Sequence, residues 1–213
     1  MTALEPALEL ERIVSLPDFE AIARERMEPA AFDYVAGGAW DELTLHEAPQ
    51  AWQLRRFVPR VLRGISGVDL RTTFLGQASA LPVAIAPMAA QLLGHPEGEA
   101  EMARGAAAAG IPMCLSTSAS MPLEDVAAVA PDSPRFFQLY LVGDLGYTRE
   151  LVQRAEAAGF RGILLTVDLP VLGYRDRDRR SGFALPRMPM VDGATAAEDR
   201  DRYGGLDRQR EIG

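Results

Sequence analysis

The feature that most constrains the fold of this chain is the run Ile-Leu-Leu-Thr-Val at residues 163–167. Polar and apolar residues do not alternate in it, which is typical of a strand that is buried on both faces of a parallel sheet. Pro170 soon follows and ends the strand, because proline cannot donate a hydrogen bond to a neighbouring strand. Comparable runs come earlier, at residues 81–87, 111–115 and 135–141.

Helical segments separate these runs, at residues 96–110, 122–130 and 148–158. The first begins with proline and acidic residues and ends at glycine, as helices commonly do. Strands that alternate with such helices predict β-α-β units, right-handed crossovers and an α/β fold around a parallel sheet. Residues 79–189 are therefore predicted to contain four strands and the loop that follows the fourth.

The flanking segments lack this alternation of strands and helices. Residues 190–213 are rich in Asp, Arg, Ala and Gly without an apolar period, which predicts a loop or a disordered tail. The charged run at residues 175–180 is predicted to be mostly a solvated loop. Residues 1–78 are expected to form short helices and then a hairpin, with helices starting near Ser15 and spanning 30–36 and 44–54, and strands at 57–62 and 69–75.

Charge and composition exclude several classes of protein. With a net charge of −8, the chain offers no electrostatic attraction to nucleic acid or to an anionic membrane. No run approaches the roughly 18 apolar residues of a membrane span, and the N-terminus lacks the apolar core of a signal peptide. The single cysteine, Cys114, rules out an internal disulfide and favours a reducing compartment, so a cytoplasmic location is expected.

The titratable residues narrow the possible chemistry. All 22 basic residues are arginine, so no lysine can act as a base or form a Schiff base. His46 and His95 are assigned no catalytic role, and His95 is expected to fix the loop before a helix. No metal site is predicted.

Polar residues follow each of the predicted strands. Because the carboxyl ends of parallel strands meet at one edge of a sheet, these residues are expected to surround a single ligand. The alternative, which is the commoner situation for a lone Ser, Thr or Gln, is that each satisfies loop backbone groups. Matching positions after four strands favour the ligand site. The residues are Pro87-Met88-Ala89, Ser116-Thr117-Ser118, Gln138 and Tyr140, and Thr166 and Asp168, with Arg175 beyond.

Motifs along most of the chain occur in the order and at the spacing of one enzyme family. The chain resembles the FMN-dependent α-hydroxy acid dehydrogenase/oxidase family, which includes glycolate oxidase, lactate monooxygenase and mandelate dehydrogenase. Each motif alone is weak, and their joint occurrence is specific. The motifs are FDYVAGGA at 32–39, RFVPRVL at 56–62, LPVAIAPMA at 81–89, HPEGE at 95–99, LSTSAS at 115–120, RFFQLY at 135–140 and LTVDLPVLGYRDRDRR at 165–180.

The resemblance implies a TIM (β/α)8 barrel, FMN as the cofactor, and oxidation of an (S)-2-hydroxy acid to a 2-oxo acid, with electrons passing to oxygen or another acceptor. It implies that the segment Pro87, Met88 and Ala89 meets the flavin, with the Ala89 amide near N5. It also implies that the side chains of Ser116, Gln138 and Thr166 hydrogen-bond the isoalloxazine ring. Amide and hydroxyl groups at such positions tune the ring, which carries the redox chemistry.

By the same resemblance, Tyr34, Tyr140 and Arg175 hold the substrate, and Tyr140 is also catalytic. A guanidinium group matches a carboxylate through two parallel hydrogen bonds, and a phenol hydroxyl can donate to a developing oxyanion. Without the resemblance, the preferred interpretation of Tyr34 is a partly buried aromatic residue on a short helix. Ser118 stands where glycolate oxidase carries a bulky aromatic residue, so an aromatic hydroxy acid such as mandelate is expected to fit.

The remaining functional groups of the family belong to later strands: a flavin-facing Lys, a proton-accepting His, a second Arg and the phosphate site. None is matched here, so the expected fold is an incomplete barrel with four β/α units and two unpaired edges. Loss of the base alone removes a contribution of ~10²–10⁴-fold, so this chain is expected to be a truncated form that is inactive by itself. Alternatives are a half-barrel that assembles with a second copy or with a complementing C-terminal half, a non-catalytic binding module, and, for the fold, another flavin or phosphate barrel family.

Overall fold

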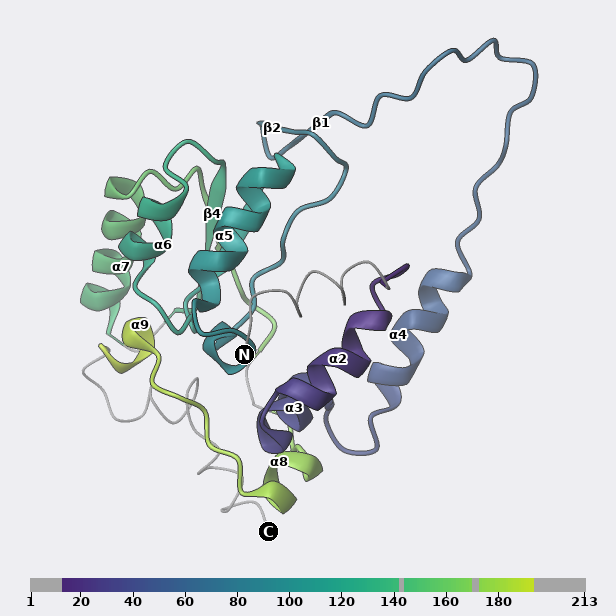
Figure 1. Cartoon of the computed structure of the whole chain (residues 1–213). Coiled ribbons are helices and arrows are strands. Elements are labelled where there is room, and N and C mark those ends of the chain that lie inside the picture. Colours follow the sequence, from purple (N-terminus) through teal and green to yellow (C-terminus); the bar gives the residue numbers. More distant parts are fainter. Residues whose placement is uncertain (1–12, 142–143, 170–172, 194–213) are drawn as a thin grey trace, which may run out of the picture.

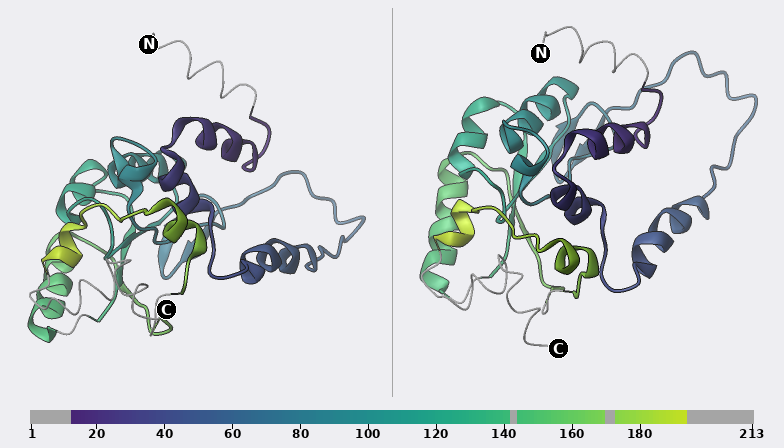
Figure 2. Two further views of the ribbon diagram at one scale, coloured as in Figure 1. Left: turned by 90° about the horizontal axis from the view of Figure 1, so that it is seen from below. Right: turned by 60° about the horizontal axis from the view of Figure 1, so that its bottom comes forward.

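The computed structural model describes residues 13–141, 144–169 and 173–193 (Figure 1). One part is a parallel sheet with helices α5, α6 and α7 packed against it. The other part contains helices α2, α3 and α8, which lie together beside the sheet, and helix α4, which stands apart from them (Figures 1 and 2). Among the described residues, no helix is long and apolar enough to cross a membrane.

The predicted N-terminal helices are confirmed as α2 (Asp18–Arg26), α3 (Pro29–Ala36) and α4 (Leu43–Gln53). Helix α3 starts where the Glu28 side chain accepts a hydrogen bond from the Ala31 amide. It stops at Gly37, where a Cβ atom would lie 2.6 Å from the Asp33 carbonyl oxygen. The loop after α3 can therefore pass close to the helix end.

The predicted hairpin is wrong in its pairing. Strand β1 (Thr72–Phe74) lies within the expected second strand, but it pairs antiparallel with β2 (Gln77–Ser79), which follows it. Leu75 and Gly76 between them both have positive φ, 46° and 79°, as a two-residue hairpin turn requires. Residues 57–62 form no strand and belong to an extended arm that leaves the rest of the molecule (Figure 1).

The predicted alternation of parallel strands and helices is confirmed. Strands β3 (Met113–Ser116), β4 (Arg135–Leu139) and β5 (Ile163–Leu165) form a parallel sheet in the order β3-β4-β5. The helices that accompany them are α5 (Gly98–Ala109), α6 (Leu123–Val129) and α7 (Leu145–Ala157). The described residues contain this three-stranded parallel sheet and the β1-β2 hairpin, and no closed barrel.

The predicted first strand, at residues 81–87, is reduced to a single parallel bridge between Ile85 and Met113. The Ile85 amide donates to the Pro112 carbonyl at 2.9 Å, and the Cys114 amide donates to the Ile85 carbonyl at 2.9 Å. Pro82 and Pro87 lie on either side and have no amide hydrogen, which limits the length of a ladder here. The segment nevertheless runs beside β3, as the prediction required.

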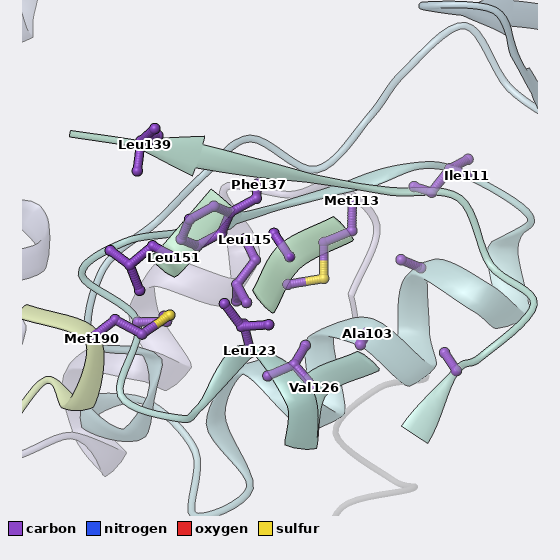
Figure 3. Packing of buried hydrophobic residues seen from close by; sticks show 14 residues of the cluster. Ala103, Ile111, Met113, Leu115, Leu123, Val126, Phe137, Leu139, Leu151 and Met190 are labelled. Carbon is purple, nitrogen blue, oxygen red and sulfur yellow. The ribbon is translucent and has the colours of Figure 1, made fainter. Parts of the chain in front are cut away.

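The hydrophobic core lies between the sheet and helices α5, α6 and α7 (Figure 3). Leu115 of β3 and Phe137 of β4 meet Leu123 of α6 and Leu151 of α7 there. All four side chains are at most 1% exposed. This packing joins the strands to the helices that follow them, so it also fixes the carboxyl ends of the strands.

The expected tail does not begin at residue 190. Helix α9 (Pro189–Asp192) places Met190 in the core with no exposed surface, and the Tyr147 hydroxyl donates to the Met190 carbonyl at 2.8 Å. Sequence periodicity missed it because one buried turn shows no period. The rest of the expected tail, residues 194–213, lies outside the described residues.

Two predictions for the fourth strand and its loop are wrong. The run 163–167 is not buried on both faces, since Ile163, Leu165 and Val167 are 39%, 48% and 80% exposed. Residues 175–180 are not mostly loop, because Asp176–Ser181 forms helix α8. Strand β5 is the last strand of the described sheet and pairs with a strand on one side only, while α8 packs against α3.

Candidate functional site

The centre of the candidate site is a row of polar side chains across the sheet. The Ser116 hydroxyl donates to Gln138 Oε1 at 3.1 Å, and Gln138 Nε2 donates to Thr166 Oγ1 at 2.9 Å. Ser116 and Gln138 are direct partners in the β3-β4 register, and the Thr166 amide donates to the Leu139 carbonyl at 3.0 Å. The structure therefore brings together the three predicted flavin-contacting side chains, from β3, from β4 and from the residue directly after β5.

This row lies on the side of the sheet opposite the core. Phe137 and Leu139 point to the helices, so Gln138 between them points the other way, because successive side chains of a strand alternate. Ser116 and Gln138 are buried, and Thr166 is half-buried. An amide group carries two hydrogens and an oxygen with two lone pairs, and a hydroxyl both donates and accepts. Such a row fits a planar ring edged with carbonyl and N–H groups, so these residues suit a flavin.

The loop after the bridge at Ile85 reaches the same edge. The Ala90 amide donates to the Ser118 carbonyl at 3.1 Å, and Gln91 Nε2 donates to the Met88 carbonyl at 3.4 Å. The predicted cofactor residues Pro87, Met88 and Ala89 precede these contacts directly, with Pro87 and Met88 exposed and Ala89 half-buried. Their backbone is therefore available beside Ser116 and Ser118.

Arg175 and Tyr34 lie together where α3 meets α8. The Arg175 guanidinium carbon is 5.0 Å from the centre of the Tyr34 ring, and Nη2 donates to the Tyr34 carbonyl. The Tyr34 ring also stacks on Phe183 at 4.9 Å. Burial raises the pKa of the Tyr34 hydroxyl, the charge of Arg175 opposes that shift, and Asp178 and Tyr140 add to it. Tyr140 is therefore near enough to Tyr34 to interact with it, and Tyr34 is a neutral hydrogen-bond donor at neutral pH.

Asp178 is a site residue that sequence reasoning missed. It is fully buried, and its Oδ2 accepts a hydrogen bond from Arg175 Nε at 2.5 Å. An acid three residues after an arginine is the available signal, because such pairs meet on one turn of a helix. The sequence analysis did not use this spacing, because it predicted that residues 175–180 are mostly a loop.

The remaining candidates lie at the margin of the site. Ser118 is buried, and its amide donates to the Ser116 hydroxyl oxygen at 3.0 Å. Asp168 and His46 are exposed. His95 Nδ1 accepts from the Glu97 amide at 3.2 Å, in agreement with its expected role in the loop before the helix.

The fold and the polar row define a parallel β/α protein with a candidate ligand site at the carboxyl ends of the strands. The chain belongs to the FMN-dependent dehydrogenase family, whose model matches residues 23–209. It is 47% identical to the L-lactate oxidase of Nostoc sp. over 176 residues, which cover 81% of this chain and 48% of that protein. It is 45% identical to glycolate oxidase 1 of Zea mays over 174 residues, covering 82% of this chain and 47% of that protein.

Solved structures agree with this assignment. A crystal structure of mandelate oxidase with 3,3-difluoro-2-hydroxy-3-phenylpropionic acid superposes with a TM-score of 0.78 at 43% identity, covering 83% of this chain and 53% of that one. A mandelate oxidase variant with a C4a-OH-FMN adduct has a TM-score of 0.76 at 38% identity, covering 92% and 57%. This chain thus spans about half the length of the relatives it matches.

Proposed function

We propose that this chain provides the N-terminal half of an FMN-dependent enzyme that oxidises an (S)-2-hydroxy acid to a 2-oxo acid. The observation that carries the proposal is the hydrogen-bonded row Ser116-Gln138-Thr166 at the carboxyl ends of adjacent parallel strands. Membership of the FMN-dependent dehydrogenase family supports it. FMN, when bound, accepts the electrons that leave the hydroxy acid.

The cofactor contacts in this proposal are divided between side chains and backbone. Ser116, Gln138 and Thr166 hold the polar edge of the flavin ring with their hydroxyl and amide groups. The backbone of Pro87, Met88 and Ala89 borders the ring from the neighbouring loop. The buried positions of Ser116 and Gln138 keep water from competing for these hydrogen bonds.

The substrate contacts come from Arg175, Tyr34 and Tyr140. A guanidinium has five N–H groups, and the bonds of Arg175 to Asp178 and to the Tyr34 carbonyl use two of them. The other N–H groups can bind the substrate carboxylate, and the Tyr34 hydroxyl can donate to it. Tyr140 is proposed as the catalytic phenol, which donates to the oxygen of the hydroxy acid as its charge changes.

The size of Ser118 supports a substrate with a bulky α-substituent. The Ser118 amide donates to the Ser116 hydroxyl oxygen of the cofactor row, and we propose that its short side chain borders the same site. Mandelate oxidase is among the solved relatives. We therefore propose that the complete enzyme accepts an aromatic hydroxy acid such as mandelate in preference to glycolate.

By itself the chain is proposed to be inactive. It spans about half of its relatives, it contains no lysine, and the apolar residues Ile163, Leu165 and Val167 are partly exposed at β5. This edge is proposed to pair with a complementing C-terminal half or with a second copy.

The single buried Cys114 supports a cytoplasmic location. One relative from rice is named a peroxisomal (S)-2-hydroxy-acid oxidase, so cell fractionation is the measurement that decides between the two locations.

The decisive experiment compares the chain alone with the chain co-expressed with the C-terminal half of the Nostoc L-lactate oxidase. We expect the chain alone to retain no flavin after gel filtration and the assembled pair to retain one FMN per complex. The pair should oxidise mandelate or another 2-hydroxy acid. A matched control replaces Gln138 with Ala, which should abolish FMN retention without preventing assembly. An assembled pair that binds no FMN would contradict the proposal.

A further inference from the structure

Glu99 is a fully buried acid outside the row of strand-end residues. It lies in the first turn of α5, and its Oε1 accepts two backbone hydrogen bonds. One comes from the Gln91 amide at 3.1 Å and the other from the Ser120 amide at 2.8 Å. These amides belong to different loops, one after the bridge at Ile85 and one after β3.

Further hydrogen bonds join the same two loops. The Ala90 amide donates to the Ser118 carbonyl at 3.1 Å, and the Leu92 amide donates to the Ser120 hydroxyl oxygen at 3.2 Å. Ala90 has a φ of 54°, which is the left-handed conformation that residues with a Cβ rarely adopt. A backbone of this kind persists only where its surroundings hold it. Glu99 supplies part of that support through its hydrogen bond with the amide of Gln91, the residue after Ala90.

The environment of Glu99 suits this task. Both hydrogen bonds to Oε1 are buried, so water does not compete for the amides of Gln91 and Ser120. Glu99 Oε2 is buried and has no hydrogen-bond partner in the part of the chain that the structure describes. The described hydrogen bonds of this side chain are therefore made by Oε1. Removing the Glu99 side chain would leave two buried amides without a hydrogen-bond acceptor.

We propose that Glu99 is a positioning residue that fixes the Ala89 amide and the Ser116–Ser118 backbone relative to each other for flavin binding. This proposal rests on the proposed function, since Ala89 and Ser116 matter through the flavin. Glu99 does not contact the proposed cofactor row itself. It acts through the amides of Gln91 and Ser120, which lie two residues beyond Ala89 and Ser118.

The first test is amide hydrogen exchange on the full chain without FMN. Glu99→Ala should raise exchange more than tenfold in the peptides covering 86–93 and 116–122, and should leave β4 and α7 unchanged. Glu99→Gln retains an oxygen acceptor of the same reach and should restore most of the protection. The matched control is Glu101→Ala, which truncates a glutamate of the same helix whose exposed side chain pairs with Arg104. It should change neither loop.

The second test uses the FMN-loaded pair with the C-terminal half of the Nostoc relative. Glu99→Ala should weaken FMN binding at least tenfold and shift the visible absorption bands of the flavin, and Glu99→Gln should recover both. Unchanged amide exchange of the two loops in Glu99→Ala would overturn the proposal. A loss of protection throughout the chain would also overturn it, because Glu99 would then be required for folding. If the loops lose protection but the unmutated pair binds no FMN, the proposed function fails and the link from Glu99 to the flavin is overturned with it.

Discussion

Strands β4 and β5 have similar apolar sequences but very different surroundings. All five residues of β4 are buried, whereas Ile163 and Leu165 of β5 are 39% and 48% exposed. Strand β4 has a strand on each side and helices over one face, while the chain after β5 leaves to pack on α3. An apolar run thus predicts a strand, but its burial depends on what the rest of the fold places beside it.

The largest expected effect comes from truncating one apolar side chain in each of the two strands. Phe137→Ala should lower the free energy of unfolding by about 3–5 kcal/mol, because it opens a cavity in the core. Leu165→Ala should lower it by about 1 kcal/mol or less, because much of that side chain already faces solvent. Urea unfolding followed by circular dichroism measures both. Equal losses would mean that β5 is covered in solution.

Helix α8 allows the same comparison between a buried and an exposed ion pair. Asp178→Ala removes the buried partner of Arg175 and should cost about 2–3 kcal/mol of stability, below the range for fully buried pairs because Arg175 is 19% exposed. Asp176→Ala removes the surface pair with Arg180 and should cost about 0.5 kcal/mol or less. Thermal denaturation of the two variants measures the difference. A larger loss in Asp176→Ala would contradict the assigned pairing.

A smaller, pH-dependent effect is expected where α6 and α7 meet at the surface. The hydrogen bond from Arg154 holds the pKa of Glu124 below its usual value of 4.5. Because the folded pKa is the lower one, this stabilisation is complete above the unfolded pKa and is lost as the pH falls through the folded pKa. Glu124→Gln should therefore cost about 0.5 kcal/mol at pH 7, after allowing for solvent screening, and less at pH 3, which lies below the unfolded pKa. Denaturant midpoints at the two pH values provide the measurement, and a pH-independent cost would contradict it.

The smallest expected effect is the rate at which a maleimide labels Cys114 of β3 in the native protein. Burial raises the pKa of its thiol to about 12, so almost no thiolate forms at pH 8 and labelling by a maleimide should be very slow. Val167→Cys, in a Cys114→Ser background, places a thiol at a position that is 80% exposed after β5 and should label rapidly. Rapid labelling of native Cys114 would show that the sheet opens readily.

The sequence alone was sufficient for the parallel strands β3, β4 and β5, for the helices between them and for the presence of polar residues at the strand ends. Buried strands that alternate with helices leave a strong periodic signal, so β3, β4, β5 and the three helices after the hairpin were predicted. The placement of polar residues at strand ends was predicted for the same reason, because parallel strands bring their carboxyl ends to one edge. Resemblance to a family added the roles of Ser116, Gln138 and Thr166, which remain proposals.

Only the tertiary structure decided what depends on contacts between distant segments. The exposure of β5, the turn of α8 onto α3 and the burial of Met190 follow from which surfaces meet, and no local pattern records that. The same holds for Asp178 and Glu99, which are fully buried in the structure although acids of this kind usually lie at the surface. A side chain's type is written in the sequence, whereas its partners and its access to water are set by residues up to 141 positions away, as between Arg175 and Tyr34.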